Sequence, residues 1–195
     1  MSETSLSLLQ RLRHEPDPGS WQRLVDLYTP LLRDWLRRVA LQPQDADDLI
    51  QDVFGVLVKE LPHFDYEPER GSFRSWLRAI MANRLRAFYR ARQTRPMAVG
   101  GSDFACLAAQ LEDPHSELSQ LWNREHDQYV WRRLLQLIKP DFEAPTWDAF
   151  QRVTLEGVKP AQVAKDLGVS VNAVFIAKSR VMRRLRQEID GLSEI

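Results

Sequence analysis

The chain has 195 residues, of which 44% are hydrophobic and 28% are charged, and this composition excludes a chain that is disordered throughout. Its apolar stretches are short, which argues against a membrane span, and residues 1–10 do not resemble a secretory signal. The single cysteine, Cys106, excludes an internal disulfide and a cysteine-rich zinc site. The net charge is zero, but acids dominate residues 41–69 and 97–131, whereas residues 70–96 hold eight arginines and no acid. These charged blocks either pair within the fold or face different partners.

Three helices are predicted in the first half of the chain, because apolar residues recur there every three or four positions. The first helix spans residues 21–39, with a kink or break at Pro30. The second spans residues 49–61, and the third spans residues 73–88 behind Ser72, which is suited to cap its N-terminus. The three apolar stripes can share one core.

The apolar periodicity fades after residue 93 and returns in the last third of the chain. Prolines, glycines and scattered acids predict a flexible linker, and Asp113 followed by Pro114 predicts the start of a helix that ends near Ile138. Three shorter apolar stripes follow between residues 147 and 185. We therefore predict an all-α fold with two small helical domains joined by a flexible linker. The predicted parts are an N-terminal extension (1–19), a first domain (20–93), a linker (94–125) and a second domain (126–191).

Residues 160–186 show the pattern of a helix-turn-helix. Pro160 is suited to start its first helix, Gly168 permits a left-handed turn, and Ser170 can cap the second helix. The second helix holds five basic residues and no acid over residues 171–186, as a helix that enters the major groove of DNA requires. The alternative is a solvent-exposed helix in an ordinary bundle.

The helix predicted over residues 73–90 has a second, polar arc that favours contact with nucleic acid. Arginines alternate there with small residues, so that a phosphate backbone can approach closely. The arc consists of Ser75, Arg78, Ala79, Ala82, Asn83, Arg86, Tyr89 and Arg90. Phe64 and Tyr66, in the loop before this helix, are candidates either to stack on an unpaired base or to belong to the core.

A polar strip of Asp48, Gln51, Asp52 and Gly55 lies opposite the apolar stripe of the second predicted helix. Two aspartates one turn apart repel each other by a few tenths of a kcal/mol, so that the pair favours a basic partner. Stabilisation of the helix dipole explains acids in the first turn but not Asp52, which lies beyond it. A metal site is a further alternative, but no histidine lies nearby to complete a set of ligands.

In their order and spacing, these motifs resemble those of a bacterial sigma factor of the extracytoplasmic-function group, in the sigma-70 family. The resemblance covers about residues 20–93 and 132–191, and it is carried by residues 45–54, residues 71–80, Asn83 with Arg84, and the helix-turn-helix. It implies a cytoplasmic promoter-specificity subunit that binds core RNA polymerase, recognises the minus-ten and minus-thirty-five elements of promoter DNA and helps to melt the promoter. It also implies that the chain is no enzyme, needs no cofactor or metal, and has no membrane partner.

The resemblance assigns individual residues to three surfaces. The expected partners on the polymerase are the clamp helices of its largest subunit and its flap region, and the residues assigned to polymerase binding are Asp48, Gln51, Asp52 and Phe54. The residues assigned to the minus-ten element are Phe64, Tyr66, Arg70, Phe73, Arg74, Trp76, Arg78, Asn83, Arg84, Arg86, Tyr89 and Arg90. The residues assigned to the minus-thirty-five element are Ser170, Asn172, Ala173, Ile176, Lys178, Ser179, Arg180 and Arg183.

Two departures from the family pattern limit what the resemblance implies. Ala87 stands where the family commonly has an acid, so that a local ion pair is missing. Residues 173–177 replace a polar and basic stretch at the start of the recognition helix, so that the minus-thirty-five specificity of the family does not carry over. The promoter sequence, the inducing signal and the existence of an anti-sigma factor stay open, as does the role of Cys106.

Two other functions fit parts of the sequence. A stand-alone transcriptional regulator would use only the helix-turn-helix, and a metal-dependent nuclease would use Asp45, Asp48 and Asp52. Only a sigma factor accounts for the acidic strip, the linker and the order of the motifs together. We also hypothesise that the acidic segment 97–131 folds back on the arginine-rich helix, since opposite charges attract each other.

Overall fold

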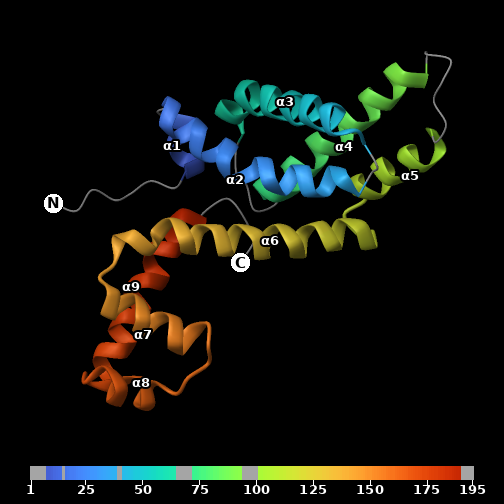
Figure 1. The fold of residues 1–195 in the computed structure, drawn as a ribbon. Coiled ribbons are helices and arrows are strands. Elements are labelled where there is room, and N and C mark those ends of the chain that lie inside the picture. The colour runs from blue at the N-terminus through green and yellow to red at the C-terminus, as the bar shows by residue number, and fades with distance from the viewer. Residues whose placement is uncertain (1–7, 15, 39–40, 65–71, 94–100, 190–195) are drawn as a thin grey trace. The chain divides into compact units, whose positions relative to one another are not determined.

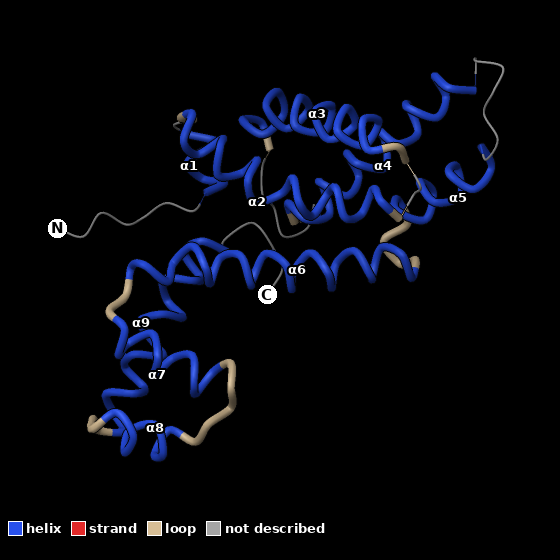
Figure 2. The backbone as a smooth tube through the Cα atoms, viewed as in Figure 1, coloured by secondary structure: helices blue, strands red, loops and turns tan. Residues whose placement is uncertain are grey.

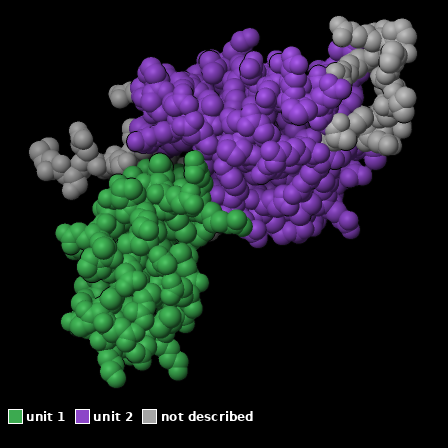
Figure 3. All heavy atoms as spheres, viewed as in Figure 1, with its two compact units in different colours: residues 1–7, 131–190 green, residues 8–130, 191–195 purple. Residues whose placement is uncertain are grey.

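The computed structural model describes residues 8–14, 16–38, 41–64, 72–93 and 101–189, and all regular elements in these ranges are helices (Figure 2). The predicted all-α class is confirmed. The described residues form two compact units, which we call the N-terminal unit, up to Val130, and the C-terminal unit, from Trp131 (Figure 3). None of the helices in the described ranges is long and apolar enough to cross a membrane.

The N-terminal unit is built from six helices and one short 3-10 turn of the described chain (Figure 1). In chain order they are α1 (Leu8–His14), α2 (Pro18–Arg37), α3 (Pro43–Glu60), η1 (Leu61–His63), α4 (Phe73–Gln93), α5 (Gly101–Glu112) and the first part of α6 (Glu117–Ile138). Helices α2, α3 and α4 share one core, as their apolar stripes predicted. The core residues that are at most 2% exposed include Leu24, Tyr28, Leu32, Leu36, Leu49, Leu57, Phe73 and Leu77.

Helix α2 is a single helix, although we expected Pro30 to kink or break it. It starts at Asp17, whose carboxylate accepts a hydrogen bond from the Ser20 amide at 2.9 Å. A hydrogen bond from the Ser20 hydroxyl, together with the one from its amide, lowers the pKa of Asp17 below its usual value. The helix then continues through Pro30, because residues 27, 28, 31 and 32 on either side of the proline are buried together in the core and hold the two turns in line.

The segment that we expected to be a flexible linker contains α5 and the start of α6, and α5 packs along α4. Ala108 and Leu111 of α5 are at most 1% exposed. The Ser119 hydroxyl donates to the main-chain oxygens of Gln110 and Leu111 at 3.0 and 3.1 Å, which ties α6 to the end of α5. This segment is helical because its apolar residues at 104, 107, 108 and 111 follow the period of a helix.

The start of α6 also differs from the prediction. We expected Asp113 to be the N-cap, but the helix begins at Glu117 and Ser116 caps it, accepting a hydrogen bond from the Ser119 amide at 3.0 Å. The Asp113 side chain instead accepts from the His115 amide at 2.9 Å, in the turn between α5 and α6. The predicted end of the helix, near Ile138, is confirmed.

The C-terminal unit continues from α6 through η2 (Lys139–Asp141), α7 (Ala144–Thr154), α8 (Pro160–Leu167) and α9 (Val171–Ile189). Gly168 adopts the predicted left-handed conformation, with φ of 65°, at the end of α8. Ser170 accepts a hydrogen bond from the Ala173 amide at 3.1 Å, so it caps α9 as predicted. A small core holds the helices together and consists of Ala149, Val163, Ala164, Val174 and Ala177.

Candidate functional site

The acidic strip lies on the exposed side of α3, as predicted. Asp48, Gln51 and Asp52 are all exposed, and Phe54 is half-buried. Among the described residues, no basic side chain pairs with Asp48 or Asp52. Asp47, by contrast, forms an ion pair with Arg33 of α2, with 2.7 Å between nitrogen and oxygen. The two aspartates of the strip therefore present their charge to solvent and to any partner.

Gly55 extends the acidic strip by one turn. Because glycine has no side chain, the helix surface is flat at this position. A Cβ atom placed on this residue would meet nothing within 4 Å, so the fold itself does not require glycine here. Glycine inside a helix costs about 0.5–1 kcal/mol of stability relative to alanine. Val58, which the sequence analysis did not single out, follows on the same side and is 54% exposed. The strip thus combines negative charge, a flat position and an exposed apolar side chain, which together suit close packing against a basic helix.

The polar arc of α4 is only partly exposed, contrary to the prediction. Arg74 and Arg78 are 6% and 5% exposed, because α5 and the first part of α6 cover this side of the helix. Arg74 forms an ion pair with Asp127 of α6, and Arg78 donates to the side-chain oxygen of Asn123 at 3.2 Å. Phe73 and Ala82 are fully buried as well. In this structure, DNA cannot contact the buried side chains of Phe73, Arg74 and Arg78.

The exposed part of α4 carries the remaining predicted residues. Asn83, Arg84 and Arg90 are exposed, and Tyr89 is half-buried. Arg86 is half-exposed and pairs with Glu112 of α5. With the pair between Arg74 and Asp127, this contact is what we expected from an acidic segment that folds back on the arginine-rich helix.

Three aromatic residues form a stacked group at the start of α4. The rings of Phe64 and Trp76 are nearly parallel, with 4.4 Å between their centroids and 18° between their planes. The Phe73 ring packs edge-on against Phe64 at 6.2 Å. Phe64 and Trp76 are both half-buried, so that Phe64 belongs to the edge of the core and still reaches the surface. Tyr66 and Arg70, which we assigned with them, lie outside the described residues.

The outer face of α9 carries the residues predicted to read DNA. Asn172, Ile176, Ser179, Arg180 and Arg183 are exposed, and Ala173 and Lys178 are half-buried. Ser170 is exposed, but its hydroxyl oxygen already accepts the capping hydrogen bond. The position of α9 is fixed through its core residues and through Arg184, which pairs with Asp141 of η2 and also, within α9, with Glu188. An ion pair between Arg152 and Asp166 joins α7 to α8 and lowers the pKa of Asp166.

Comparison with known proteins assigns the family. Residues 24–95 match the family model described as sigma-70 region 2, which takes in most of α2 and all of α3 and α4. Residues 24–95 therefore form a sigma-70 region 2 domain. The chain is also similar to the RNA polymerase sigma factor CnrH of Cupriavidus metallidurans, with 27% identity over 175 residues that cover 88% of this chain and 87% of the relative. Both matches support the predicted resemblance to a sigma factor of the extracytoplasmic-function group.

The N-terminal unit holds a buried polar network that the sequence analysis missed. His126 of α6 is fully buried, and its Nε2 lies 3.2 Å from the Tyr28 hydroxyl of α2. Its Nδ1 lies 3.1 Å from the Asp127 carboxylate, which in turn pairs with Arg74 of α4. Because a carboxylate only accepts, Nδ1 carries the proton and Nε2 accepts from Tyr28. Burial lowers the pKa of His126, and the neighbouring Asp127 partly opposes this shift. Burial also raises the pKa of Tyr28 well above its usual value.

This network predicts a loss of stability in mild acid. An unfolded histidine has a pKa near 6.5, and the folded pKa of His126 lies lower, so the unfolded chain binds more protons in this range. The free energy of unfolding should therefore fall as the pH drops through about 6.5. Urea unfolding of the full chain at pH 7.5 and 5.5 measures the effect, and His126→Phe should flatten the difference. A His126→Phe variant with the full pH dependence would contradict this assignment.

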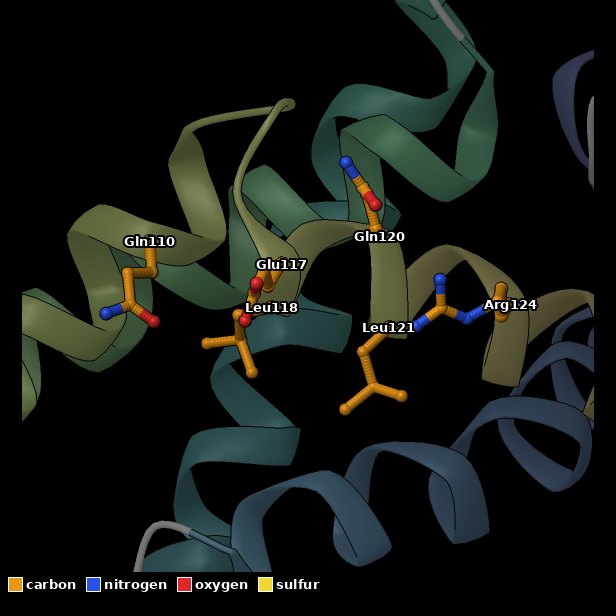
Figure 4. Close-up of a pocket in the computed structure, with 6 residues that line it drawn as sticks. All are labelled: Gln110, Glu117, Leu118, Gln120, Leu121 and Arg124. Atoms are coloured by element: carbon orange, nitrogen blue, oxygen red, sulfur yellow. The ribbon is translucent and has the colours of Figure 1, made fainter.

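The part of the chain that the structure describes shows no further chemical site. An open hollow between α5 and α6 is lined by two leucines, two glutamines, Glu117 and Arg124, and the two charged side chains lie apart (Figure 4). In the described ranges, no three histidine, cysteine or acidic side chains are placed to hold a metal ion. Cys106 is exposed, and its sulfur accepts a weak hydrogen bond from the Gln110 side chain at 3.5 Å.

Proposed function

We propose that this sigma factor confers promoter specificity on bacterial RNA polymerase, and that it acts by binding rather than by catalysis. In this proposal, the N-terminal unit binds the polymerase and the minus-ten element, and the C-terminal unit binds the minus-thirty-five element. The observation that carries it is the acidic strip: Asp48 and Asp52 are exposed and unpaired within the described chain, on the helix that the sigma-70 region 2 model matches. The proposal implies a cytoplasmic location, where the polymerase works.

The strip on α3 is the proposed contact with the clamp helices of the largest polymerase subunit. Asp48 and Asp52 supply charge for a basic helix, and Gln51 can add hydrogen bonds. Gly55 lets the partner's backbone approach, while Phe54 and Val58 supply apolar contact on either side of it. For the flap region of the polymerase, the proposal rests on the family resemblance of the C-terminal unit.

The exposed part of α4 and the aromatic group form the proposed minus-ten surface. Arg84 and Arg90 are placed to neutralise phosphates, and Asn83 is placed to bond to a base or sugar. Stacking on an aromatic side chain stabilises an unpaired base by about 1–3 kcal/mol. If the stacked rings of Phe64 and Trp76 separate, they can stack on a base that leaves the duplex and so compensate for the stacking energy that the base loses. Arg74 and Arg78 then support the surface from below instead of contacting DNA.

The proposal is tested by reconstituted transcription. The full chain is combined with core polymerase from a related bacterium and with genomic DNA fragments, and transcript starts are mapped. Defined starts that require the chain would support a promoter-specificity subunit. A chain that binds promoter DNA tightly on its own but does not bind polymerase would favour the stand-alone regulator instead.

Gly55 provides a separate prediction about the polymerase contact. Gly55→Ala should raise the free energy of unfolding by up to about 1 kcal/mol, because the added Cβ meets no neighbour. Gly55→Leu should also fold, but it should weaken polymerase binding by roughly 5- to 150-fold, the cost of one overpacked contact. Glu60→Leu is the matched control, because it places the same side chain on another exposed face of α3. Equal polymerase affinity of both leucine variants would rule out close packing over Gly55.

A further inference from the structure

The start of α9 exposes an apolar surface that the fold does not use. We call Val169, Val171, Phe175 and Ile176 the apolar patch; they are 42%, 41%, 52% and 46% exposed. The core of the helix-turn-helix takes the residues between them, Val174 and Ala177, which are buried. Phe175 was not singled out from the sequence, and it is the most exposed of the four. Large apolar side chains that gather at one surface indicate a binding site for a partner.

Two residues of the apolar patch, Phe175 and Ile176, lie on the side of α9 that is turned away from its core. With 100° per residue, Ile176 falls beside Asn172 and Arg183, opposite Val174 and Val181. Phe175 lies one turn after Val171, on the flank of the same face. Ile176 therefore lies on the surface proposed to face DNA and Phe175 lies beside it, at the end of the helix that would enter the groove first.

The charge around the apolar patch points to a polyanionic partner. Residues 171–186 contain five basic side chains and no acid, and only Arg184 among them has described acidic partners. Arg180, Arg183 and Arg186 are exposed on the turns that follow the patch. A partner must thus offer phosphates to the later turns and apolar groups to the first two. The major groove of DNA offers both, because thymine exposes its C5 methyl group there.

We infer that the apolar patch reads thymine methyl groups in the minus-thirty-five element, with Phe175 and Ile176 as the specificity-determining residues. This inference rests on the proposed function and names what its C-terminal unit selects. Among the first seven residues of α9, Asn172 alone has a side chain with both a donor and an acceptor, so it can form two hydrogen bonds to one base. Discrimination at the neighbouring positions then comes from apolar contact with methyl groups rather than from arginine contacts with guanine.

Deoxyuridine tests the inference, because it differs from thymidine only by the missing C5 methyl group. The minus-thirty-five segment of a mapped promoter is first randomised, and the sequences that the holoenzyme binds are selected. Each thymidine in the selected element is then replaced by deoxyuridine. We expect thymine-rich selected sequences and a loss of about fourfold in promoter binding for each contacted methyl group. The double variant Phe175→Ser/Ile176→Ser should bind thymidine and deoxyuridine promoters equally, and it should stay folded because neither side chain belongs to the core.

Arg183→Ala is the matched control on the same face. It should weaken binding to all promoters and reduce the salt dependence, but keep the preference for thymidine over deoxyuridine. Equal binding of thymidine and deoxyuridine promoters by the unaltered holoenzyme would overturn the inference while leaving the proposed function in place. So would a double variant that transcribes normally, which would assign the patch to a protein partner. Failure of the unaltered chain to bind polymerase would instead count against the proposed function.

Discussion

Core polymerase should no longer bind when Asp48 and Asp52 are both replaced by arginine. The change reverses two exposed charges on the surface that would face a basic helix, and like charges across an interface cost several kcal/mol. We expect the affinity for core polymerase to fall by roughly a hundredfold or more, and transcription from mapped starts to disappear. Fluorescence anisotropy of labelled full chain with core polymerase measures the affinity directly. Folding should be unaffected, because neither aspartate has a described ion pair.

A second pair of aspartates separates the effect of position from that of net charge. Asp26 and Asp34 are exposed on α2, so Asp26→Arg/Asp34→Arg changes the net charge by the same amount away from the acidic strip. We expect this control to bind polymerase with nearly unchanged affinity at physiological salt, where charges more than about 8 Å apart are largely screened. Similar losses in both double variants would mean that overall charge, and not the strip, governs the binding.

Trp122→Ala should destabilise the N-terminal unit by about 3–5 kcal/mol, the usual cost of removing a buried tryptophan side chain. Trp122 is completely buried, and its ring packs edge-on against Trp35 of α2 at 5.0 Å. Its indole N–H donates to the main-chain oxygen of Arg74 at 3.4 Å. Removing the ring therefore leaves a cavity between α2, α4 and α6 and removes this hydrogen bond.

Urea unfolding followed by circular dichroism measures this loss, because it does not depend on the fluorescence of the removed residue. Leu121→Ala is the neighbouring control on α6 and should cost far less, since Leu121 is only half-buried. If Trp122→Ala cost no more than this control, α6 would not be docked on α2 and α4 through this side chain.

The sequence predicted the elements whose signals are local. Long apolar stripes predicted α2, α3 and α4, and the turn between α8 and α9 followed from Gly168 and Ser170, whose conformations depend on their immediate neighbours. Helix α5 was missed, although its apolar residues have helical spacing. Its signal is short and follows Pro96 and two glycines, which are typical of a linker.

The candidate site was predicted less well, because a helical wheel assigns residues to faces but does not say what covers them. Arg74 and Arg78 lie on polar positions of α4, and only their partners 53 and 45 residues later in the chain bury them. His126 looks unremarkable in the sequence for the same reason: its hydrogen-bond partner Tyr28 is 98 residues away. The exposed charges of Asp48 and Asp52 needed no distant partner, and these two were placed correctly.

The docking of α5 and α6 onto α4 determines where this protein can be cut and recombined. A chimera that takes only the residues matched by the region 2 model would end near residue 95 and uncover the fully buried Ala82 and Leu85 together with Arg78. Such a fragment should aggregate or unfold. A junction after Val130 retains Trp122, His126 and Asp127, so the transplantable module of this chain extends past residue 95, where the family match ends, to Val130.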